Sequence, residues 1–261
     1  MKNYQTALIT GASSGIGEAF AEALAKEGMD LILVARSKDK LEEIAVRLAM
    51  KHDRRVEVIT ADLSRPQPGA ALLKKVQALG MDVDLLLNNA GFGTVGSFHK
   101  LDVAREHEEV MLNVAAVVDI AHAFLPGMLE RGRGGIINTA SVAGFQPIPF
   151  MSVYAASKAF VLSFSHGLWG EYRKQGIHVL AVCPGPVDTG FFEATGNKQL
   201  RSTVPSPLMM TAEKVVAQSL RAFKAGETVV VPGVQNKAVT WMSRVLPRKL
   251  NALMMAQAMK R

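Results

Sequence analysis

The sequence predicts a three-layer α/β fold, in which a doubly wound parallel sheet of about seven strands is covered by helices on both faces. Short apolar runs alternate with longer helix-like stretches, which is the rhythm of repeated βαβ units. The runs are apolar nearly throughout, as expected for parallel strands buried on both faces. The expected strands are residues 6–10, 30–35, 56–60, 83–88, 135–139, 178–183 and 228–231.

Helical patterns fill the intervals between these runs. Residues 16–27 and 38–51 each present one apolar face, and the longest pattern runs from about 152 to 174. Gly176 suits the end of that longest helix, because glycine readily adopts the left-handed backbone of a helix C-terminus. Residues 1–233 are therefore expected to form a single domain, a usual size for an α/β fold.

The composition of the 261 residues excludes several classes of protein. With 49% apolar residues and no low-complexity tract, the chain is not a disordered protein. Cys183 is the only cysteine, so an intrachain disulfide scaffold is excluded. No apolar run resembles a transmembrane helix, and the first strand follows Met1 too closely for a secretory signal. The expected location is the cytoplasm.

The net charge of +7 belongs to the end of the chain. No acidic residue follows Glu227, whereas six basic residues do, and the remainder is nearly neutral. Residues 234–261 also carry many apolar side chains, and Pro247 divides them into two short helical pieces. We expect this segment to be a helical extension packed on or near the domain. Covering a substrate pocket, packing on a second subunit and lying on an anionic membrane surface are all open roles for it. No nucleic-acid recognition motif accompanies the charge, so a nucleic-acid partner is not expected.

The turn after the first strand has the composition of a phosphate-binding loop. Glycines allow a tight turn and a close approach to a pyrophosphate, and the N-terminus of the following helix favours an anion. The spacing Gly-x-x-x-Gly-x-Gly differs from Gly-x-Gly-x-x-Gly, but the physical logic is the same. The residues expected to contact a dinucleotide here are Gly11, Ser13, Ser14, Gly15, Ile16 and Gly17.

The same turn also contains Gly-x-Ser-x-Gly, which would make Ser13 a hydrolase nucleophile. The context argues against this, because no loop precedes the first strand to supply a second oxyanion N–H. His178 opens a strand instead of following one.

The end of the second strand indicates which dinucleotide is bound. NAD-selective folds usually place an acidic residue here to bind the ribose 2′-hydroxyl, but this strand ends Val34-Ala35-Arg36. Ala35 cannot accept that hydrogen bond, whereas Arg36 can pair with a 2′-phosphate. NADP(H) is therefore the favoured cofactor.

Further motifs follow in order along the chain: Asn88-Asn89-Ala90-Gly91, Asn113, Ser141, Tyr154-x-x-x-Lys158 and Pro184-Gly185-Pro186-Val187-Asp188-Thr189. Together with residues 10–17 they resemble the short-chain dehydrogenase/reductase family, in its shorter single-domain branch. The resemblance runs from residue 6 to about 231 and implies a Rossmann-type sheet. It also implies an oxidoreductase that transfers a hydride between a nicotinamide and the carbonyl or alcohol carbon of a substrate.

The residues themselves support acid–base chemistry. Tyr154 and Lys158 are four apart and project from one face of the long helix. We expect the ammonium to lower the pKa of the phenol from about 10 toward neutrality. Ser141, at the end of the fifth strand, can hydrogen-bond a substrate oxygen. The alternatives are a surface Tyr–Lys pair and a helix-capping serine.

The resemblance implies the remaining roles. Tyr154 would protonate the substrate oxygen, Lys158 would also hold the nicotinamide ribose, and Asn113 would anchor a water in the proton relay. A polar residue at a helix kink is the alternative for Asn113. Tyr154, like Lys158, is also an implied cofactor contact. The other implied cofactor contacts are Asp62 and Leu63 near the adenine, Asn89, Ala90 and Gly91 along the adenosine, and Val187 and Thr189 at the carboxamide and pyrophosphate.

Two of these implied contacts are open to another interpretation. Asp62 is equally consistent with an ordinary helix N-cap. NADP-preferring members often carry a basic residue in the glycine turn, where this chain has Ser14, so NAD(H) is not excluded. Lys38 is a second candidate for the 2′-phosphate.

Residues 189–212 fall where the family places a substrate lid. Phe191, Phe192, Leu208, Met209 and Met210 would offer apolar surface to a substrate, as would Phe145, Ile148, Phe150 and Met151 from the segment before Tyr154. The expected substrate is therefore apolar, although the same residues would also serve to pack the lid on the domain.

Three further expectations concern metal binding, the oligomeric state and the alternative functions. The six histidines show no metal-ligand spacing, so no metal is assigned. Family members commonly form homodimers or homotetramers through long helices, and the helix carrying Tyr154 is the matching candidate. The alternative functions are a non-catalytic dinucleotide-binding regulator and a membrane-surface adaptor that acts through the basic tail.

Overall fold

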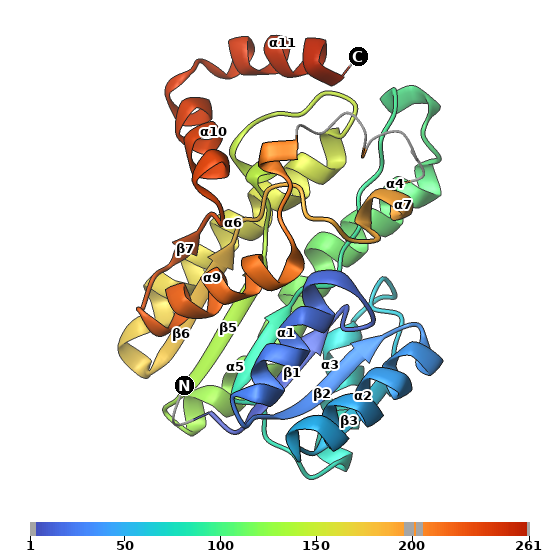
Figure 1. Cartoon of the computed structure of the whole chain (residues 1–261), viewed down its shortest axis with the longest axis vertical. Coiled ribbons are helices and arrows are strands. Elements are labelled where there is room, and N and C mark those ends of the chain that lie inside the picture. Colours follow the sequence, from blue (N-terminus) through green and yellow to red (C-terminus); the bar gives the residue numbers. More distant parts are fainter. Residues whose placement is uncertain (1–3, 196–200, 202–205, 260–261) are drawn as a thin grey trace.

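The computed structural model describes residues 4–195, 201 and 206–259. Seven parallel strands form one sheet in the order β3-β2-β1-β4-β5-β6-β7 (Figure 1). The strands are β1 (Thr6–Thr10), β2 (Asp30–Ala35), β3 (Val56–Thr60), β4 (Leu85–Asn88), β5 (Gly134–Thr139), β6 (Ile177–Val182) and β7 (Val229–Val230). The predicted fold class is confirmed, and every strand lies within two residues of its expected range.

Helices cover both faces of the sheet. The longer helices are α1 (Gly15–Lys26), α2 (Lys38–His52), α3 (Pro68–Ala78), α4 (Val103–Val110), α5 (Ala116–Glu130), α6 (Ser152–Tyr172), α9 (Ala212–Lys224), α10 (Val234–Val245) and α11 (Arg248–Met259). The short ones are η1 (Phe98–Lys100), the π-helical turn η2 (Met111–Ala115), η3 (Val142–Phe145), η4 (Arg173–Gln175), α7 (Phe191–Ala194) and η5 (Ser206–Leu208). Helices α1, α2 and α9 cover one face, and α3, α5 and α6 cover the other.

The alternation of side chains along each strand builds a core on both faces. Ile9 and Leu33 belong to the cluster beneath α1, α2 and α9, whereas their neighbours Leu8 and Ile32 belong to the cluster beneath α3 and α5. All four are fully buried. Each side chain buried in this way contributes about 1.5–3 kcal/mol to folding, which is why these strands are apolar without alternation.

The strand order reverses between β1 and β4, which places a crevice at their carboxyl ends. Such a switch point is where open α/β sheets bind ligands. Thr10 ties the two strand ends together, because its hydroxyl accepts hydrogen bonds from the N–H groups of Asn89 (2.9 Å) and Ala90 (3.0 Å). The turn after β1 is therefore fixed against the turn after β4.

One expectation about apolar runs was wrong. Helices α4, η2 and α5 form a continuous helix, Val103–Glu130, that is long and apolar enough by composition to cross a membrane. In the fold, however, α5 packs against the sheet and α3, with Ile120 and Phe124 buried in the core. This packing buries 39% of the apolar stretch and explains that part of its composition.

The tail forms two helices at one end of the molecule, beyond the carboxyl ends of the strands (Figure 1). Helix α10 ends at Val245 and α11 begins at Arg248, on either side of Pro247. Figure 1 shows α11 running across the top, separated from the sheet by the loops that precede α6 and α9.

Candidate active site

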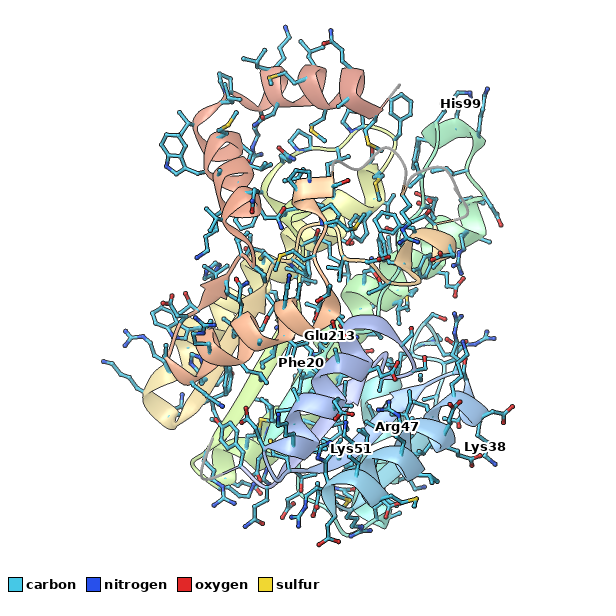
Figure 2. The ribbon with its side chains drawn as sticks, viewed as in Figure 1. Phe20, Lys38, Arg47, Lys51, His99 and Glu213 are labelled. Carbon is cyan, nitrogen blue, oxygen red and sulfur yellow. The ribbon has the colours of Figure 1, made fainter. Side chains whose placement is uncertain are left out.

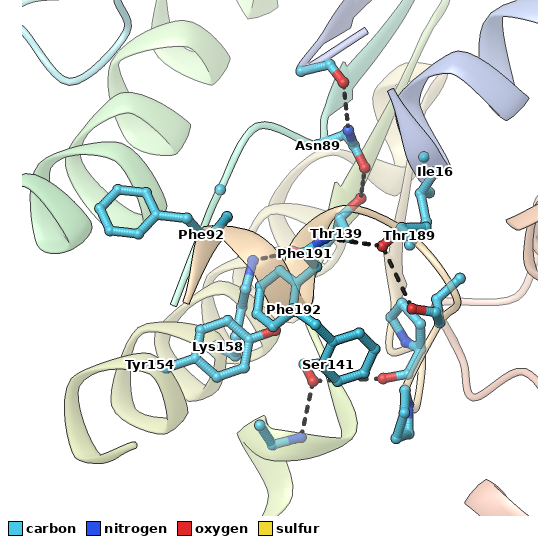
Figure 3. A pocket seen from close by; sticks show the side chains of 18 of the residues that line it. Ile16, Asn89, Phe92, Thr139, Ser141, Tyr154, Lys158, Thr189, Phe191 and Phe192 are labelled. Carbon is cyan, nitrogen blue, oxygen red and sulfur yellow. Dashed lines mark hydrogen bonds between the residues drawn. The ribbon is translucent and has the colours of Figure 1, made fainter. Parts of the chain in front are cut away.

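A cavity of about 690 Å³ lies along the carboxyl ends of the strands. Its walls come from the turn after β1, the loops after β2 to β6, helix α6, the segment around α7 and the two tail helices. Figure 3 shows side chains from several of these elements converging on the same space. The cavity is therefore assembled from parts that are far apart in the sequence.

The structure brings nearly all the sequence-predicted residues to this cavity. Those that line it are Gly11, Ser13, Ser14, Gly15, Ile16, Arg36, Asp62, Leu63, Asn89, Ala90, Gly91, Ser141, Tyr154, Lys158, Val187 and Thr189. Gly17 and Asn113 lie behind the wall, where both are buried.

The glycine turn is packed too closely for larger residues. A Cβ added at Gly17 would lie 2.2 Å from the carbonyl oxygen of Gly11, and Gly11 itself has a φ of 67°, which disfavours other residues. The Asn89 amide donates hydrogen bonds to the carbonyls of Thr10 (3.1 Å) and Gly11 (3.3 Å). Backbone N–H groups at the start of α1 remain available to an anion. The turn thus fits a pyrophosphate.

The charged residues beyond this turn come from the ends of β2 and β3. Arg36 is largely exposed and pairs with Glu108, with its Nη1 3.2 Å from Oε1. Asp62 accepts hydrogen bonds from the backbone and the hydroxyl of Ser64, and these bonds, of which the hydroxyl's is the stronger influence, hold the pKa of its carboxyl below the ordinary value. Asp62 is not a helix N-cap, because the next helix, α3, begins at Pro68 after Gln67. It stays available at the cavity wall.

Tyr154, Lys158 and Ser141 meet in the middle of the cavity (Figure 3). The Lys158 ammonium lies 5.7 Å from the centre of the Tyr154 ring and donates a 2.8 Å hydrogen bond to the carbonyl of Thr139. The ring of Phe191 lies 5.3 Å from that of Tyr154, which closes the other side. The Ser141 oxygen accepts a hydrogen bond from the N–H of Ala143 (3.1 Å). The spacing of Tyr154 and Lys158 therefore places both in one pocket, as predicted.

The expected effect on the phenol is not found in the structure. Burial raises the pKa of Tyr154 to about 12, and the nearby Glu109 adds to the rise while hydrogen bonding with Ser141 opposes it. Burial also lowers the pKa of Lys158 to about 8. The desolvation of the phenolate thus outweighs the opposing hydrogen bond with Ser141. The chain by itself holds Tyr154 in the protonated form, which is the form that donates a proton.

Asn113 lies in the π-helical turn between α4 and α5 and is fully buried. Its side-chain amide donates to the carbonyl of Phe92 (2.8 Å) and the hydroxyl of Ser157 (3.1 Å), and its oxygen accepts from the N–H of Phe92 (3.2 Å). The residue therefore fixes the loop after β4 to helix α6. This position agrees with the interpretation of Asn113 as a polar residue at a helix irregularity, and its role in a proton relay stays a prediction.

A buried carboxyl cluster next to the site was not predicted. Glu109 is fully buried and Glu106 nearly so, and the hydroxyl of Thr94 lies between them, in contact with Oε1 of Glu106 and 2.9 Å from Oε2 of Glu109. Burial raises the pKa of Glu109 to about 7, with a smaller contribution from the charge of Glu106. A hydroxyl has one proton to donate, so a protonated Glu109 can supply the second hydrogen bond of the group. In the sequence, both glutamates resembled an ordinary solvated helix face.

Replacing Glu109 by glutamine should stabilise the protein at pH 8 and have little effect at pH 4.5. The pKa of Glu109 rises from an ordinary 4.5 to about 7 on folding, so the folded state keeps a proton that the unfolded state releases between these values. Wild-type stability therefore falls as pH rises through this window, by about 2–3 kcal/mol, and glutamine does not titrate. Urea unfolding at both pH values measures the difference.

The exposed Glu43 on α2 provides the matched control, since glutamine there should change stability little at either pH. A Glu109→Gln protein that is less stable at pH 8 than at pH 4.5, relative to wild type, would show that an ionised Glu109 supports the fold.

The far end of the cavity is apolar. Among the predicted substrate-facing residues, Phe191, Phe192, Leu208, Ile148 and Met151 line it, whereas Met209, Met210, Phe145 and Phe150 do not. Part of the predicted lid, residues 196–200 and 202–205, lies outside the described residues. Additional apolar lining residues that the sequence did not reveal are Phe92, Leu112, Val239, Met255, Ala258 and Met259.

The hydrolase interpretation finds no support in this geometry. Ser13 lines the cavity, but His178 lies on β6 with its ring 4.6 Å from that of Phe223, and it does not line the cavity. Within the described part of the chain, no three histidine, cysteine or acidic side chains are grouped to hold a metal ion.

Fold and cavity together define a dinucleotide-binding α/β protein with an acid–base group at its centre. The chain belongs to the short-chain dehydrogenase family, whose sequence profile matches residues 5–200. It is accordingly an NAD(P)-dependent oxidoreductase acting on CH–OH or C=O groups.

Individual relatives are similar over most of the chain. A 17-beta-hydroxysteroid dehydrogenase type 3 from Danio rerio is 36% identical over 226 residues, which cover 85% of this chain and 70% of the relative. A short-chain dehydrogenase from Sphingobium yanoikuyae, solved in complex with NADPH, is 35% identical with a TM-score of 0.81 and covers 94% and 97% of the two chains. A bulky-bulky ketone specific alcohol dehydrogenase from Comamonas testosteroni is 33% identical with a TM-score of 0.78 and covers 94% and 96%.

Proposed function

We propose that this protein is an NADP-dependent carbonyl reductase and alcohol dehydrogenase for bulky apolar substrates, with Tyr154 as its acid–base group. The observation that carries the proposal is the continuity of the cavity. One space runs from the glycine turn past Arg36 to Tyr154 and on to an apolar end. The NADPH complex and the bulky-ketone specificity of two similar structures support the same cofactor and substrate class.

In this proposal, the glycine turn and the start of α1 hold the pyrophosphate, Asp62 and Leu63 contact the adenine, and Arg36 pairs with the 2′-phosphate. Asn89, Ala90 and Gly91 pack along the adenosine, and Val187 and Thr189 contact the carboxamide and pyrophosphate. When bound, NADPH supplies the hydride that reduces the carbonyl carbon. Ser14 leaves the turn without a cation, so NAD(H) remains an acceptable second cofactor.

The chain's own residues supply the proton. Ser141 donates a hydrogen bond to the substrate oxygen and positions it beside the phenol. Tyr154, protonated at neutral pH because burial raises its pKa to about 12, gives its proton to that oxygen as negative charge develops there. The Lys158 ammonium stabilises the phenolate that remains and holds ribose hydroxyls. Asn113 positions a water that returns the proton.

The quaternary and cellular settings are parts of the same proposal. Phe160 on α6 is 40% exposed and stacks on Phe164 with ring centres 5.8 Å apart, so it presents an apolar side chain on the outer side of this helix. This exposed ring supports a homodimer or homotetramer formed through α6, as is common in the family. The proposed setting is the cytoplasm.

Replacing Arg36 by alanine should weaken NADPH binding by about tenfold to a hundredfold and leave NADH binding unchanged, because only NADPH carries the 2′-phosphate. In the structure, Arg36 shares Glu108 with Arg105, whose Nη1 lies 2.6 Å from Oε2. Arg36 can therefore leave Glu108 at little cost, since that carboxylate keeps a partner. Calorimetric titration with both nucleotides measures the effect.

Lys38 is the matched control. It is exposed, points away from the molecule (Figure 2), lies 3.5 Å from Glu42 and does not line the cavity. Its replacement by alanine should change neither affinity. An equal loss for NADPH and NADH in the Arg36 variant would remove its assignment to the 2′-phosphate. No binding of either nucleotide to the wild type would contradict the proposed function itself.

A further inference from the structure

Helix α10 presents its polar residues to the inside of the molecule and its apolar residues to the outside. Asn236, Thr240 and Ser243 are buried, and they lie three to four residues apart on one face. On the opposite face, Val234, Trp241 and Val245 are 78%, 67% and 66% exposed. This is the reverse of the usual surface helix of a soluble domain.

Each buried polar side chain of α10 has a hydrogen-bond partner. The Asn236 amide donates to the carbonyl of Pro232 (3.0 Å), and the Ser243 hydroxyl donates to that of Thr240 (2.9 Å). These bonds are local to the helix, but the Asn236 amide also contacts the sulfur of Met210 at 3.6 Å, and the buried Asn251 of α11 donates to the carbonyl of Ser243 (2.7 Å). These two contacts tie the polar face to the domain and to α11, which leaves the apolar stripe facing outward.

The second tail helix also exposes apolar side chains. On α11 the exposed apolar residues are Leu250, Leu253 and Met254. We call these residues, together with Val234, Trp241, Met242 and Val245, the tail face. Single exposed apolar side chains are ordinary, but seven of them on two consecutive helices indicate a binding surface.

All the charge on this part of the chain is positive. Lys237, Arg248 and Lys249 are exposed beside the tail face, and no acidic residue follows Glu227 in the sequence. An apolar stripe with tryptophan and flanking cations is the composition of a helix that lies in the interface of a membrane. The charge complements anionic lipid headgroups.

We propose that α10 and α11 dock the protein on an anionic lipid membrane through the tail face. A second copy of the chain fits the surface less well. In a two-fold symmetric contact the same patch meets itself, so the cations beside one tail face would meet those of the other with no acidic residue of the tail to pair with them. An anionic bilayer instead pairs with the cations and receives the apolar side chains.

The other side of the tail lines the cavity, which gives the docking a consequence for substrate entry. Val239, Met255, Ala258 and Met259 belong to the cavity wall, and the amide of Gln146 contacts the sulfur of Met255 at 3.7 Å. A tail resting on a bilayer therefore holds the cavity wall close to the lipid. If the proposed function is right, apolar substrates dissolved in the membrane reach the site from that side.

Vesicle co-sedimentation of the full chain tests the docking without any use of activity. The probes are vesicles of phosphatidylcholine alone and of phosphatidylcholine mixed with phosphatidylglycerol. The wild type should bind the anionic vesicles, and weakly or not at all the neutral ones. Changing Lys237, Arg248 and Lys249 to glutamine should weaken that binding by about a hundredfold. Changing Trp241 and Val245 to serine should weaken it at least about tenfold.

The control replaces Met50, an apolar residue on α2 that is 83% exposed and remote from the tail, by serine. This variant should bind anionic vesicles as the wild type does. Sedimentation equilibrium of each variant without lipid detects a subunit interface. The proposal would be overturned if the wild type did not bind anionic vesicles. It would also be overturned if the tail variants still bound the vesicles but no longer formed an oligomer that the wild type forms.

A turnover measurement separates this inference from the proposed function. A long-chain ketone carried in anionic vesicles should show a raised KM with the Trp241→Ser, Val245→Ser variant, while a small water-soluble ketone should be reduced as by the wild type. Vesicle binding by a protein that reduces neither ketone would uphold the docking and contradict the proposed function.

Discussion

Replacing Tyr154 by phenylalanine should lower carbonyl reduction by about 10²- to 10⁴-fold and leave the affinity for NADPH unchanged. The substitution removes only the hydroxyl group. The ring can keep its contacts with Phe191, 5.3 Å away between ring centres, and with Gly93, whose added Cβ would lie 2.9 Å from the Tyr154 ring. Ser141 and Lys158 also remain in place. The variant therefore lacks the proton donor and little else.

The two readouts are NADPH oxidation with a bulky apolar ketone and calorimetric titration with NADPH. Tyr172→Phe, at the end of the same helix, is the matched control and should be fully active because Tyr172 does not line the cavity. An active Tyr154→Phe enzyme would contradict the assignment of Tyr154 as proton donor. An inactive one that has also lost NADPH binding would indicate damage to the site as a whole.

The raised pKa of Tyr154 predicts how the rates of carbonyl reduction and of alcohol oxidation depend on pH. Because the pKa is raised to about 12 in the chain by itself, the phenol keeps its proton over the whole neutral range. Reduction needs this protonated form and should be nearly constant from pH 6 to 7.5, while alcohol oxidation needs the phenolate and should rise as the pH increases.

The sequence predicts the sheet well because its strands are buried on both faces. Continuous apolar runs such as residues 31–35 are typical of parallel strands that are covered on both faces. The deviations are at strand ends. Strand β4 begins to pair at Leu85, whereas the sequence predicted a start at residue 83. Just before this start, the carboxylate of Asp84 accepts a 2.8 Å hydrogen bond from the N–H of Gln5. Such side-chain bonds leave no periodic signal.

The local motifs also bring nearly all the predicted cofactor and catalytic residues to one cavity. Most of them follow a strand end at the same edge of the sheet, whereas Tyr154 and Lys158 reach the cavity from α6. What the sequence does not reveal depends on burial and on contacts between distant segments. The spacing of Tyr154 and Lys158 predicts their proximity, but not the desolvation that raises the pKa of the tyrosine. Glu109 resembles a surface residue until Thr94 is placed against it.

The tail, residues 234–261, also shows that the sequence does not reveal contacts between distant segments. Its composition predicts two helices with apolar and basic residues but leaves three roles open. Only the fold shows that Val239 and Met255 line the cavity while Trp241 faces outward. Sequence periodicity indicates that a helix has two faces, whereas the side on which the domain lies depends on tertiary contacts such as the bond between Asn251 and Ser243.

Replacing Lys158 by methionine should lower turnover by at least about a hundredfold and, unlike Tyr154→Phe, also weaken NADPH binding by about tenfold. Methionine keeps the length and the apolar stem of the side chain but has no charge. It leaves the carbonyl of Thr139 without its 2.8 Å hydrogen bond and the phenolate of Tyr154 without a neighbouring cation. It also removes the proposed contact of the ammonium with the ribose.

The pH profile separates the charge of Lys158 from its shape. Burial lowers the pKa of Lys158 to about 8, so the ammonium loses its proton as the pH passes that value, and wild-type reduction should decline above it. The methionine variant, with no group to titrate, should be slow but show no decline near pH 8. A variant that is equally slow yet still declines there would assign that titration to another group, and Glu109, whose pKa is raised to about 7, would be the first to test. The charge of Lys158 is thus assigned to catalysis only if the methionine variant loses both the hundredfold in turnover and the decline of the reduction rate near pH 8.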